Sequence, residues 1–398
     1  MTELRPLEPT ELPAAYDAIE LAFGGDPHPE DCTVEISVID PSRTLAAFDG
    51  TTPIATAGWF DLTMTLPGTV APVAGVTWVS VSPVHRRQGL LTAMMRRQLD
   101  DLRAEGRPIA ALWASEGAIY QRYGYGPATW QHAVEVRRGA AFTRPVAVDV
   151  LRLEPPSQAL LSPAYDAVAA TVPGFFARDA RWWPFRLHDP AHRRRGASPL
   201  RCVVDGTAGY ALYTTKSNWG PAGSAGVVTV QELVARTPEA EARLWRYLLD
   251  IDLMATVSAP GIALDSPLLH LLAEPRAAVA RLGDALWVRL VSLAEALHTR
   301  RYATEVDVVL EVRDAFCPWN AGRWRLSGGP SGAVCAATTD AADLVLDARD
   351  LGAVFLGGTS LLTRARAGWV TETTPGALAA TSLAFGWPGP APHCPMIF

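Results

Sequence analysis

One stretch of the chain constrains the fold more than any other. Residues 79–91 read Val-Ser-Val-Ser-Pro-Val-His-Arg-Arg-Gln-Gly-Leu-Leu. The first part is typical of an extended strand, Pro83 interrupts it, and the next residues bring two arginines and a glycine to the start of a helix. The first N–H groups of a helix lack partners within the helix, and the positive end of its dipole lies there. This segment therefore predicts a strand, a turn and a helix that together hold a phosphate group.

The elements that follow extend this unit. Apolar residues recur at three- and four-residue spacing from Leu91 to Leu102, which predicts a helix that ends at Gly106. Residues 109–113 are typical of a short buried strand, and residues 115–123 of a short polar and aromatic helix. The chain thus places a helix that carries tyrosines directly after the second strand of the unit.

This order of strand, Arg-x-x-Gly turn, helix, strand and tyrosine-bearing helix resembles the acyl-CoA core of the GNAT N-acetyltransferases. Within that group the chain is identified as a member of the Eis (enhanced intracellular survival) family. The resemblance rests on residues 81–91, on Ala-Ser-Glu-Gly-Ala-Ile-Tyr at 114–120 and on the carboxyl-terminal Phe398, and it covers the whole chain. Leu91 stands where most GNAT sequences have Gly or Ala, which backbone phosphate binding should tolerate.

Length and composition set the broad class. A chain of 398 residues suggests two or three domains, and 49% hydrophobic with 19% charged residues indicates a folded globular protein. No apolar run approaches the roughly 20 residues that span a bilayer, and the acidic start lacks the layout of a secretory signal. We therefore expect a cytoplasmic protein with no membrane partner. The net charge of −6 disfavours a nucleic-acid partner and is compatible with a cationic substrate.

The cysteines do not form a motif. Five cysteines lie far apart in the sequence, with no Cys-x-x-Cys pair and no Cys/His cluster. We interpret them as buried or incidental thiols in preference to a disulfide framework or a zinc site. No metal is expected.

The order of predicted elements suggests a duplication. Strands are expected at residues 44–48, 54–66 and 73–81, and a proline-rich stretch follows near residues 145–163. A strand, a helix and a strand then recur between residues 227 and 257, which repeats the first layout. The turn of this second copy, residues 235–243, has no glycine and carries acidic residues that repel a pyrophosphate. The second copy is therefore expected to bind no cofactor.

The last part of the chain has a different pattern. Residues 306–312 alternate as in a strand, and residues 342–362 contain helical spacing. The resemblance implies an α/β (α+β) protein with tandem GNAT folds at residues 1–133 and 134–290, followed by a sterol-carrier-protein-like domain at residues 291–398. We expect this third domain to build the oligomer and close the active site, because nothing in its sequence marks a lipid tunnel.

The resemblance also assigns a cofactor site. It implies that acetyl-CoA is the co-substrate, with its pantetheine arm along the strand and its pyrophosphate at the turn. The implied cofactor-binding residues are Val79, Ser80, Val81, Arg86, Arg87, Gln88, Gly89, Leu90, Leu91 and Ser115.

Two catalytic groups follow from the same resemblance. Tyr120 is the implied general acid for the coenzyme A sulfur, and the terminal carboxylate of Phe398 is the implied general base. For Tyr123 and Tyr125 the packing of an aromatic helix is the better interpretation. The apolar end of the chain, residues 393–398, fits a carboxyl terminus that is docked into the protein.

The acceptor is less constrained. Phe23, Asp26, His28, Glu30 and Asp31 lie where the family recognises amines, and acidic residues there suit a polyamine, although a solvated acidic loop is an almost equal alternative. The leading function is an acetyl-CoA-dependent N-acetyltransferase acting on a cationic small-molecule amine, aminoglycoside-like or polyamine, or on lysine. A biosynthetic acyltransferase with another acyl-CoA, or a lipid carrier or scaffold, are the alternatives. The resemblance further implies a homo-hexamer, and the basic run 193–195 is expected in an exposed loop.

Overall fold

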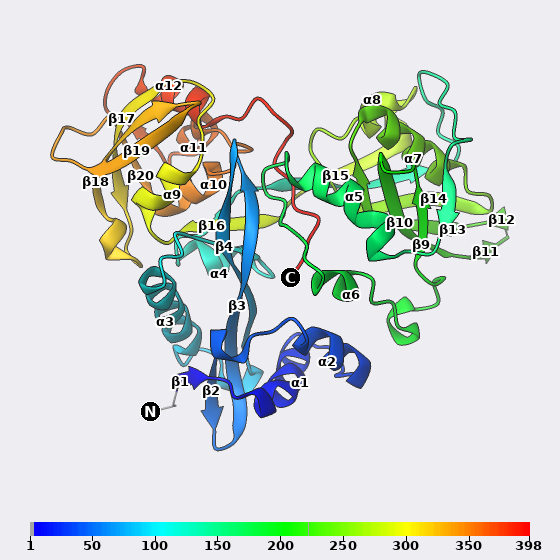
Figure 1. The fold of residues 1–398 in the computed structure, drawn as a ribbon, viewed down its shortest axis with the longest axis horizontal. Helices are drawn as coiled ribbons and strands as arrows, with labels where there is room; N and C mark the ends of the chain where they lie inside the picture. Colours follow the sequence, from blue (N-terminus) through cyan, green and yellow to red (C-terminus); the bar gives the residue numbers. More distant parts are fainter. Residues whose placement is uncertain (1–3, 222) are drawn as a thin grey trace.

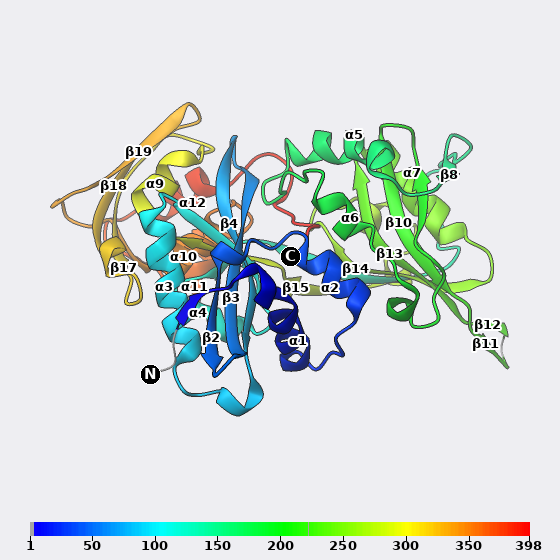
Figure 2. The same cartoon turned by 60° about the horizontal axis from the view of Figure 1, so that its bottom comes forward.

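The chain folds around three large β-sheets. The computed structural model describes residues 4–221 and 223–398, and it places the first sheet at the centre, the second to the right and the third at the upper left in Figure 1. The C-terminal segment leaves the third domain and ends between the first and second domains (Figures 1 and 2). The end of the chain is thus close to the middle of the molecule.

The first sheet has the strand order β1-β2-β3-β4-β5-β16-β6. Its strands are β1 (Leu4–Pro6), β2 (Thr44–Asp49), β3 (Thr52–Leu66), β4 (Thr69–Val81), β5 (Ile109–Trp113), β16 (Leu286–Leu290) and β6 (Gly126–Pro127). The helices of this domain are α1 (Leu12–Ala22), α2 (Pro29–Ile36), α3 (Leu90–Ala104) and α4 (Gly117–Gln121). β4 and β5 are parallel, and α3 connects them, as the spacing of apolar residues predicts.

The second sheet repeats this plan, in the order β15-β7-β14-β13-β10-β9-β8. Its strands are β7 (Trp130–Arg137), β8 (Arg152–Glu154), β9 (Arg201–Val204), β10 (Gly209–Lys216), β13 (Gly226–Ala235), β14 (Met254–Ile262) and β15 (Ala278–Asp284). The accompanying helices are α5 (Gln158–Ala169), α6 (Trp182–Arg186), α7 (Pro238–Asp250) and α8 (Leu268–Leu271). β13 and β14 are parallel and are connected by α7, the counterparts of β4, β5 and α3.

The third sheet has the order β19-β18-β17-β20-β21. It consists of β17 (Val306–Arg313), β18 (Gly322–Gly329), β19 (Gly332–Ala337), β20 (Leu344–Asp347) and β21 (Thr371–Glu372), with α9 (Leu293–Thr299), α10 (Ala348–Val354), α11 (Leu361–Arg366) and α12 (Ala377–Phe385). The alternation at residues 306–312 is confirmed as a strand, whereas residues 342–362 hold β20 as well as helical turns.

Two strands do not stay with the sequence units around them. β7 begins at Trp130, before the expected boundary at residue 133, and belongs to the second sheet. β16 lies inside the expected second unit of residues 134–290, but it pairs with β5 and β6 of the first sheet. The boundary differs from the expected one because β16 pairs with strands that are far away in the sequence. All five residues of β16 are buried in the first sheet.

The domains share their interior. One apolar cluster joins Phe60 and Leu62 of the first sheet to Phe355 and Phe385 of the third domain. The guanidinium of Arg289 on β16 pairs with Asp314 at 2.5 Å, and both side chains are buried. A buried charge of this kind is stable only when it is paired and hydrogen-bonded. The third domain is therefore fixed to the first.

The five cysteines are free thiols, namely Cys32, Cys202, Cys317, Cys335 and Cys394. This agrees with the interpretation that they form no disulfide framework.

Candidate active site

The site begins where β4 leaves β5. The parallel pairing joins Ala74, Gly75 and Val76 to Ala110, Ala111 and Leu112, and it then stops while β4 continues to Val81. The register of β3 with β4 shifts at this point, between Thr56 and Gly58. Such a bulge bends a strand and increases its twist. The edge of β4 that faced β5 is consequently left open over Val79 and Val81.

The bulge is held in place by a hydroxyl pair. Trp78 has a positive φ of 51°, and its carbonyl accepts a hydrogen bond from Thr56 Oγ1 at 2.6 Å. Thr56 Oγ1 also lies 2.9 Å from Ser80 Oγ. A non-glycine residue at positive φ persists only where its surroundings fix it. The bulge that opens the edge of β4 is thus held by specific hydrogen bonds within the first domain.

The turn after β4 leaves the N-terminus of α3 free. Gly89 is the N-cap at φ 83°, and it has no side chain that could bond the first N–H groups. Arg86 and Arg87 precede it, and Arg87 forms no ion pair within the part of the chain that the structure describes. Arg86 contacts the carbonyl of Ala22 on α1 at 3.4 Å. Two cations therefore flank helix N–H groups that no N-cap side chain of the described residues satisfies, an arrangement that favours an anion.

These elements surround one cavity of about 400 Å³. It is lined by the predicted cofactor residues except Gln88, together with Tyr120 and Phe23: Val79, Ser80, Val81, Arg86, Arg87, Gly89, Leu90, Leu91, Ser115, Tyr120 and Phe23. We call this cavity the first cleft. A second group of lining residues was not predicted, namely Ala22, His85, Thr92, Glu116, Ile119, Arg122 and Tyr123. All of them except Tyr123 lie within two positions of a predicted residue, and Ala22, next to Phe23, is also joined to the turn by its contact with Arg86.

Tyr120 presents a neutral phenol to the first cleft. Its side chain is 5% exposed, and its ring packs edge-on against Tyr125 with 6.0 Å between centroids. Burial, with smaller contributions from Tyr123 and Glu116, raises the pKa of Tyr120 to about 12. The phenol therefore keeps its proton at neutral pH and can donate it.

The carboxyl terminus is docked, as its apolar composition predicts. Trp113 Nε1, at the end of β5, donates a hydrogen bond of 2.9 Å to the carbonyl of Met396, which is itself buried. The Phe398 ring packs edge-on against Phe60 and Phe176, with centroid distances of 6.1 and 5.2 Å. A Cβ at Gly75 would lie 3.0 Å from this ring. Phe398 thus lies against β4 one residue before that strand separates from β5.

The predicted substrate residues do not gather in one place, and Asp31, unlike Asp26 and Glu30, is buried. Phe23 lines the first cleft and is 59% exposed. Asp26 is exposed in the loop between α1 and α2, and Glu30 is exposed in the first turn of α2. His28 is the N-cap of α2, and its Nδ1 accepts a hydrogen bond from the backbone N–H of Glu30 at 3.3 Å. Their role in binding an acceptor stays a prediction.

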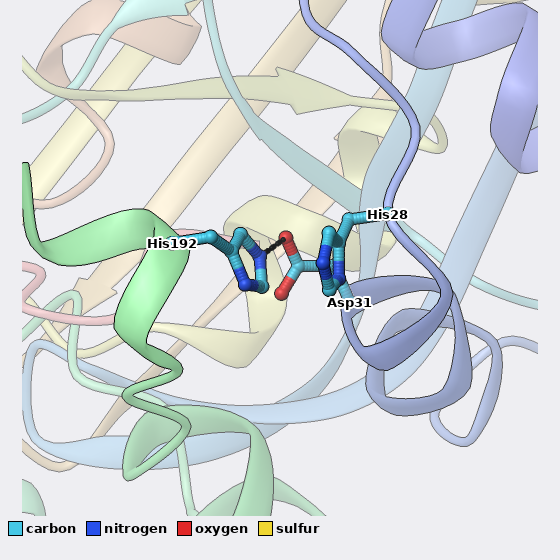
Figure 3. Close-up of side chains that lie close together, drawn as sticks. All are labelled: His28, Asp31 and His192. Carbon is cyan, nitrogen blue, oxygen red and sulfur yellow. Dashed lines mark hydrogen bonds and ion pairs between the residues drawn. The ribbon is translucent and has the colours of Figure 1, made fainter.

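A cluster around Asp31 joins the first domain to the second (Figure 3). Asp31 is 5% exposed and accepts hydrogen bonds from His188 at 2.7 Å, His192 at 2.8 Å and Arg193 at 2.7 Å. The rings of His28 and His192 are stacked with 3.5 Å between centroids. Burial opposes the charge of Asp31, but hydrogen bonds from His192, Arg193 and His188 outweigh it and lower its pKa to about 2. Arg193 is exposed, as expected, and it nevertheless reaches Asp31 with its guanidinium.

The same cluster has the donor atoms of a metal site. His28, Asp31 and His192 offer ligand atoms that all lie within 4.8 Å of one another. Both carboxylate oxygens of Asp31 already accept hydrogen bonds, one of them from the Arg193 cation. A permanent cation beside a carboxylate competes with a metal ion for it. The geometry therefore fits an ion-pair joint between the domains.

Comparison with known proteins agrees with this architecture. Residues 3–128 and 174–290 each match a family model described as an acetyltransferase (GNAT) domain, and residues 293–395 match a sterol carrier protein domain. The chain is 34% identical to the N-acetyltransferase Eis of Mycobacterium tuberculosis, over 85% of each chain. The crystal structure of Eis1 from Mycobacterium abscessus superposes with a TM-score of 0.86 at 31% identity, covering 100% of both chains.

The chain belongs to the Eis family of N-acetyltransferases. An uncharacterized N-acetyltransferase of Streptomyces avermitilis is more similar in sequence. The two chains are 44% identical over 96% of this chain and 97% of the relative. The protein is thus an enzyme of the GNAT type, built from tandem GNAT folds and a sterol-carrier-type domain. GNAT acetyltransferases use acetyl-CoA.

No helix in residues 4–221 and 223–398 is long and apolar enough to cross a membrane.

Proposed function

We propose that this Eis-family enzyme transfers the acetyl group of acetyl-CoA to a primary amine of a cationic small molecule, aminoglycoside-like or polyamine, or of a lysine side chain. The observation that supports it most is the first cleft, in which an uncapped helix N-terminus, two arginines and a buried tyrosine line one cavity. The net charge of −6 favours a cationic acceptor over an anionic one.

The residues of the first cleft fit acetyl-CoA at both ends. The open edge of β4 offers backbone groups of Val79 and Val81 to an extended amide-containing arm, as an added strand would be held. The N–H groups of Leu90 and Leu91, with Arg86 and Arg87, provide donors and positive charge for the pyrophosphate. A Cβ at Gly89 would meet no atom within 4 Å, so this position is open toward a ligand.

The proposed chemistry needs one proton acceptor and one proton donor. The amine nitrogen attacks the thioester carbonyl carbon, the carbonyl carbon–sulfur bond breaks, and the amide bond forms. The carboxylate of Phe398 accepts the amine proton, directly or through a water molecule. Tyr120 gives its proton to the departing sulfur, since its raised pKa keeps the phenol protonated until the thiolate forms. No covalent intermediate on the enzyme is needed.

A thiol-release assay over a panel of amines tests this function. The full chain with acetyl-CoA should release coenzyme A with a polyamine, an aminoglycoside or a lysine peptide, and mass spectrometry should show one added acetyl group. A bulkier acyl donor that outperforms acetyl-CoA with a single metabolite would replace this proposal by a biosynthetic acyltransferase.

Tyr120→Phe is the informative variant. Loss of a positioned acid typically lowers turnover by about 10²–10⁴-fold, while acetyl-CoA affinity should stay within about twofold. Tyr125→Phe is the matched control, because the Tyr125 hydroxyl is buried without a partner in the described part of the chain. Equal activity of both variants would show that Tyr120 is not the acid.

We further propose a homo-hexamer, for which the three-domain chain is the subunit. Light scattering should give a mass near six times 42.7 kDa. A mass near that of one chain would contradict this assembly.

A further inference from the structure

The second GNAT domain contains its own cleft. The parallel pairing of β13 with β14 stops at Thr229 and Ser258, and the register of β10 with β13 shifts at the next residues, between Leu212 and Tyr213. The first domain shows the same two features where β4 leaves β5. A cavity of about 560 Å³ opens there, within the usual range of ligand sites, which is about 300–1,000 Å³. We call it the second cleft.

The second cleft is unsuited to a pyrophosphate. The N-terminus of α7 is capped by the side chain of Thr237, whose Oγ1 accepts a hydrogen bond from the N–H of Ala240 at 3.2 Å. Glu239 and Glu241 stand in the first turn of α7, where α3 has no acidic residue. Acidic groups at this end of a helix repel anions. The duplicated fold has therefore kept the cleft while losing its anion site.

Acidic groups line this cleft instead. Glu241 Oε1 accepts hydrogen bonds from Ser266 at 2.5 Å and from Trp245 Nε1 at 3.3 Å, which fix the carboxylate in place. Within the described residues, the other oxygen of Glu241 has no such partner. Asp265 is a second acidic lining residue, and its Oδ2 accepts the N–H of Ala391 at 2.8 Å. Burial raises the pKa of Glu241, so its anion is destabilised while no cation lies beside it.

The remaining walls are apolar or neutral. Trp245 is fully buried, and Phe175 and Ile262 line the cavity with it. His393 contributes no charge, since burial lowers its pKa to about 4. Its Nδ1 is buried without a hydrogen-bond partner in the part of the chain that the structure describes. Among the described residues, the one arginine or lysine that lines the cleft is the exposed Arg236, two positions before α7 begins.

From this lining we infer that the second cleft is a binding site for a small organic cation, a protonated amine on an apolar body, which Glu241 recognises. The ammonium group would pair with the fixed carboxylate, and the apolar body would contact Trp245, Phe175 and Ile262. The site lies outside the first cleft, although Trp113 and residues of the C-terminal segment up to Ile397 also line it. The inference assigns to Glu241 the recognition of a cation and no step of acetyl transfer, so it extends beyond the proposed function.

Calorimetry on the full chain, with coenzyme A present, tests the site. The probe is 2-phenylethylamine, and 2-phenylethanol is its neutral analogue of similar shape. Glu241→Gln keeps the acceptor for Ser266 and Trp245 but removes the charge, and it should weaken binding by at least about tenfold. Glu239→Gln is the matched control, because Glu239 is exposed on the same turn and does not line the cleft. This control should bind the probe as the natural protein does.

A second variant tests the second cleft by filling its volume, without changing any charge. Ala167 lines the cleft from α5 and is half-buried, so Ala167→Trp should fill the cavity and abolish binding. Both Glu241→Gln and Ala167→Trp should retain acetyl transfer, which separates this inference from the proposed function. Equal binding of the amine by the Glu241→Gln and Glu239→Gln chains, or equal binding of amine and alcohol, would overturn the inference, as would the absence of binding at millimolar probe.

Discussion

The terminal carboxylate of Phe398 can be tested without changing any side chain. Cys394 allows a synthetic pentapeptide, Cys-Pro-Met-Ile-Phe, to be ligated to residues 1–393, ending either in a carboxylate or in a carboxamide. The amide has nearly the same size and lacks the negative charge. If the carboxylate is the base, the amide form should turn over about 10²–10⁴-fold more slowly, because positioned acid–base assistance contributes that factor.

The contacts of the Phe398 ring allow a separate estimate of the free energy that docks the carboxyl terminus. The ring makes two edge-on contacts, with Phe60 and Phe176, and such pairs contribute about 0.5–1.5 kcal/mol each. Their sum, about 1–3 kcal/mol, corresponds to a factor of about 5–150 in the docked population of the terminus. Phe398→Ala keeps a carboxylate at the end of the chain but loses these contacts. We expect its turnover to fall by no more than this factor, and by less than in the amide form.

Steady-state thiol release at saturating acceptor gives turnover, and calorimetry gives acetyl-CoA affinity. The ligated carboxylate form is the control for the chemistry of preparation. Acetyl-CoA affinity should be the same in all forms, because Phe398 does not line the first cleft among the described residues. An amide form as active as its carboxylate control would refute the assignment, and the base would then be sought among Asp26, His28 and Glu30.

Three further predictions concern binding and stability. Arg86→Glu with Arg87→Glu should weaken acetyl-CoA binding at least about tenfold in calorimetry, and the natural chain should show one site, since only the first domain has the basic glycine turn; two sites would contradict this. Gly89→Ala forces a side chain to φ 83°, so it should lower the melting temperature and acetyl-CoA affinity together. The lowered pKa of Asp31 contributes about 2 kcal/mol of stability above its unfolded value of 3.8, lost as the pH falls toward about 2. Asp31→Asn should therefore lose this acid dependence in denaturant titrations, whereas the exposed Asp26→Asn should keep it.

The local parts of the site could be predicted from the sequence. The strand, turn and helix of residues 79–104 depend on nearby residues, and the helix is confirmed at Leu90–Ala104. The tandem GNAT folds and the sterol-carrier-type domain are confirmed as well. Each of these follows from short-range patterns or from a motif of fixed spacing.

The long-range parts could not be predicted. Asp31 meets His188 and Arg193, which lie more than 150 positions later, and no periodicity in α2 marks that contact. The second cleft depends on where β13 separates from β14, a matter of twist and register that the alternation of residues 227–234 does not contain. The acidic turn at residues 235–243 predicts that the second copy binds no cofactor, and it does not indicate the cavity that this copy contains.

The position of β16 has a consequence for folding. Residues 286–290 supply an interior strand of the first sheet, between β5 and β6, so this sheet cannot close until the ribosome has made the whole second domain. Contacts between residues this far apart slow folding, because a long loop must be ordered before the pairing stabilises it. We expect a fragment that ends near residue 133 to be aggregation-prone, with the edges of β5 and β6 exposed. The first domain is therefore completed only after the second domain has been synthesised, although its own strands come first in the chain.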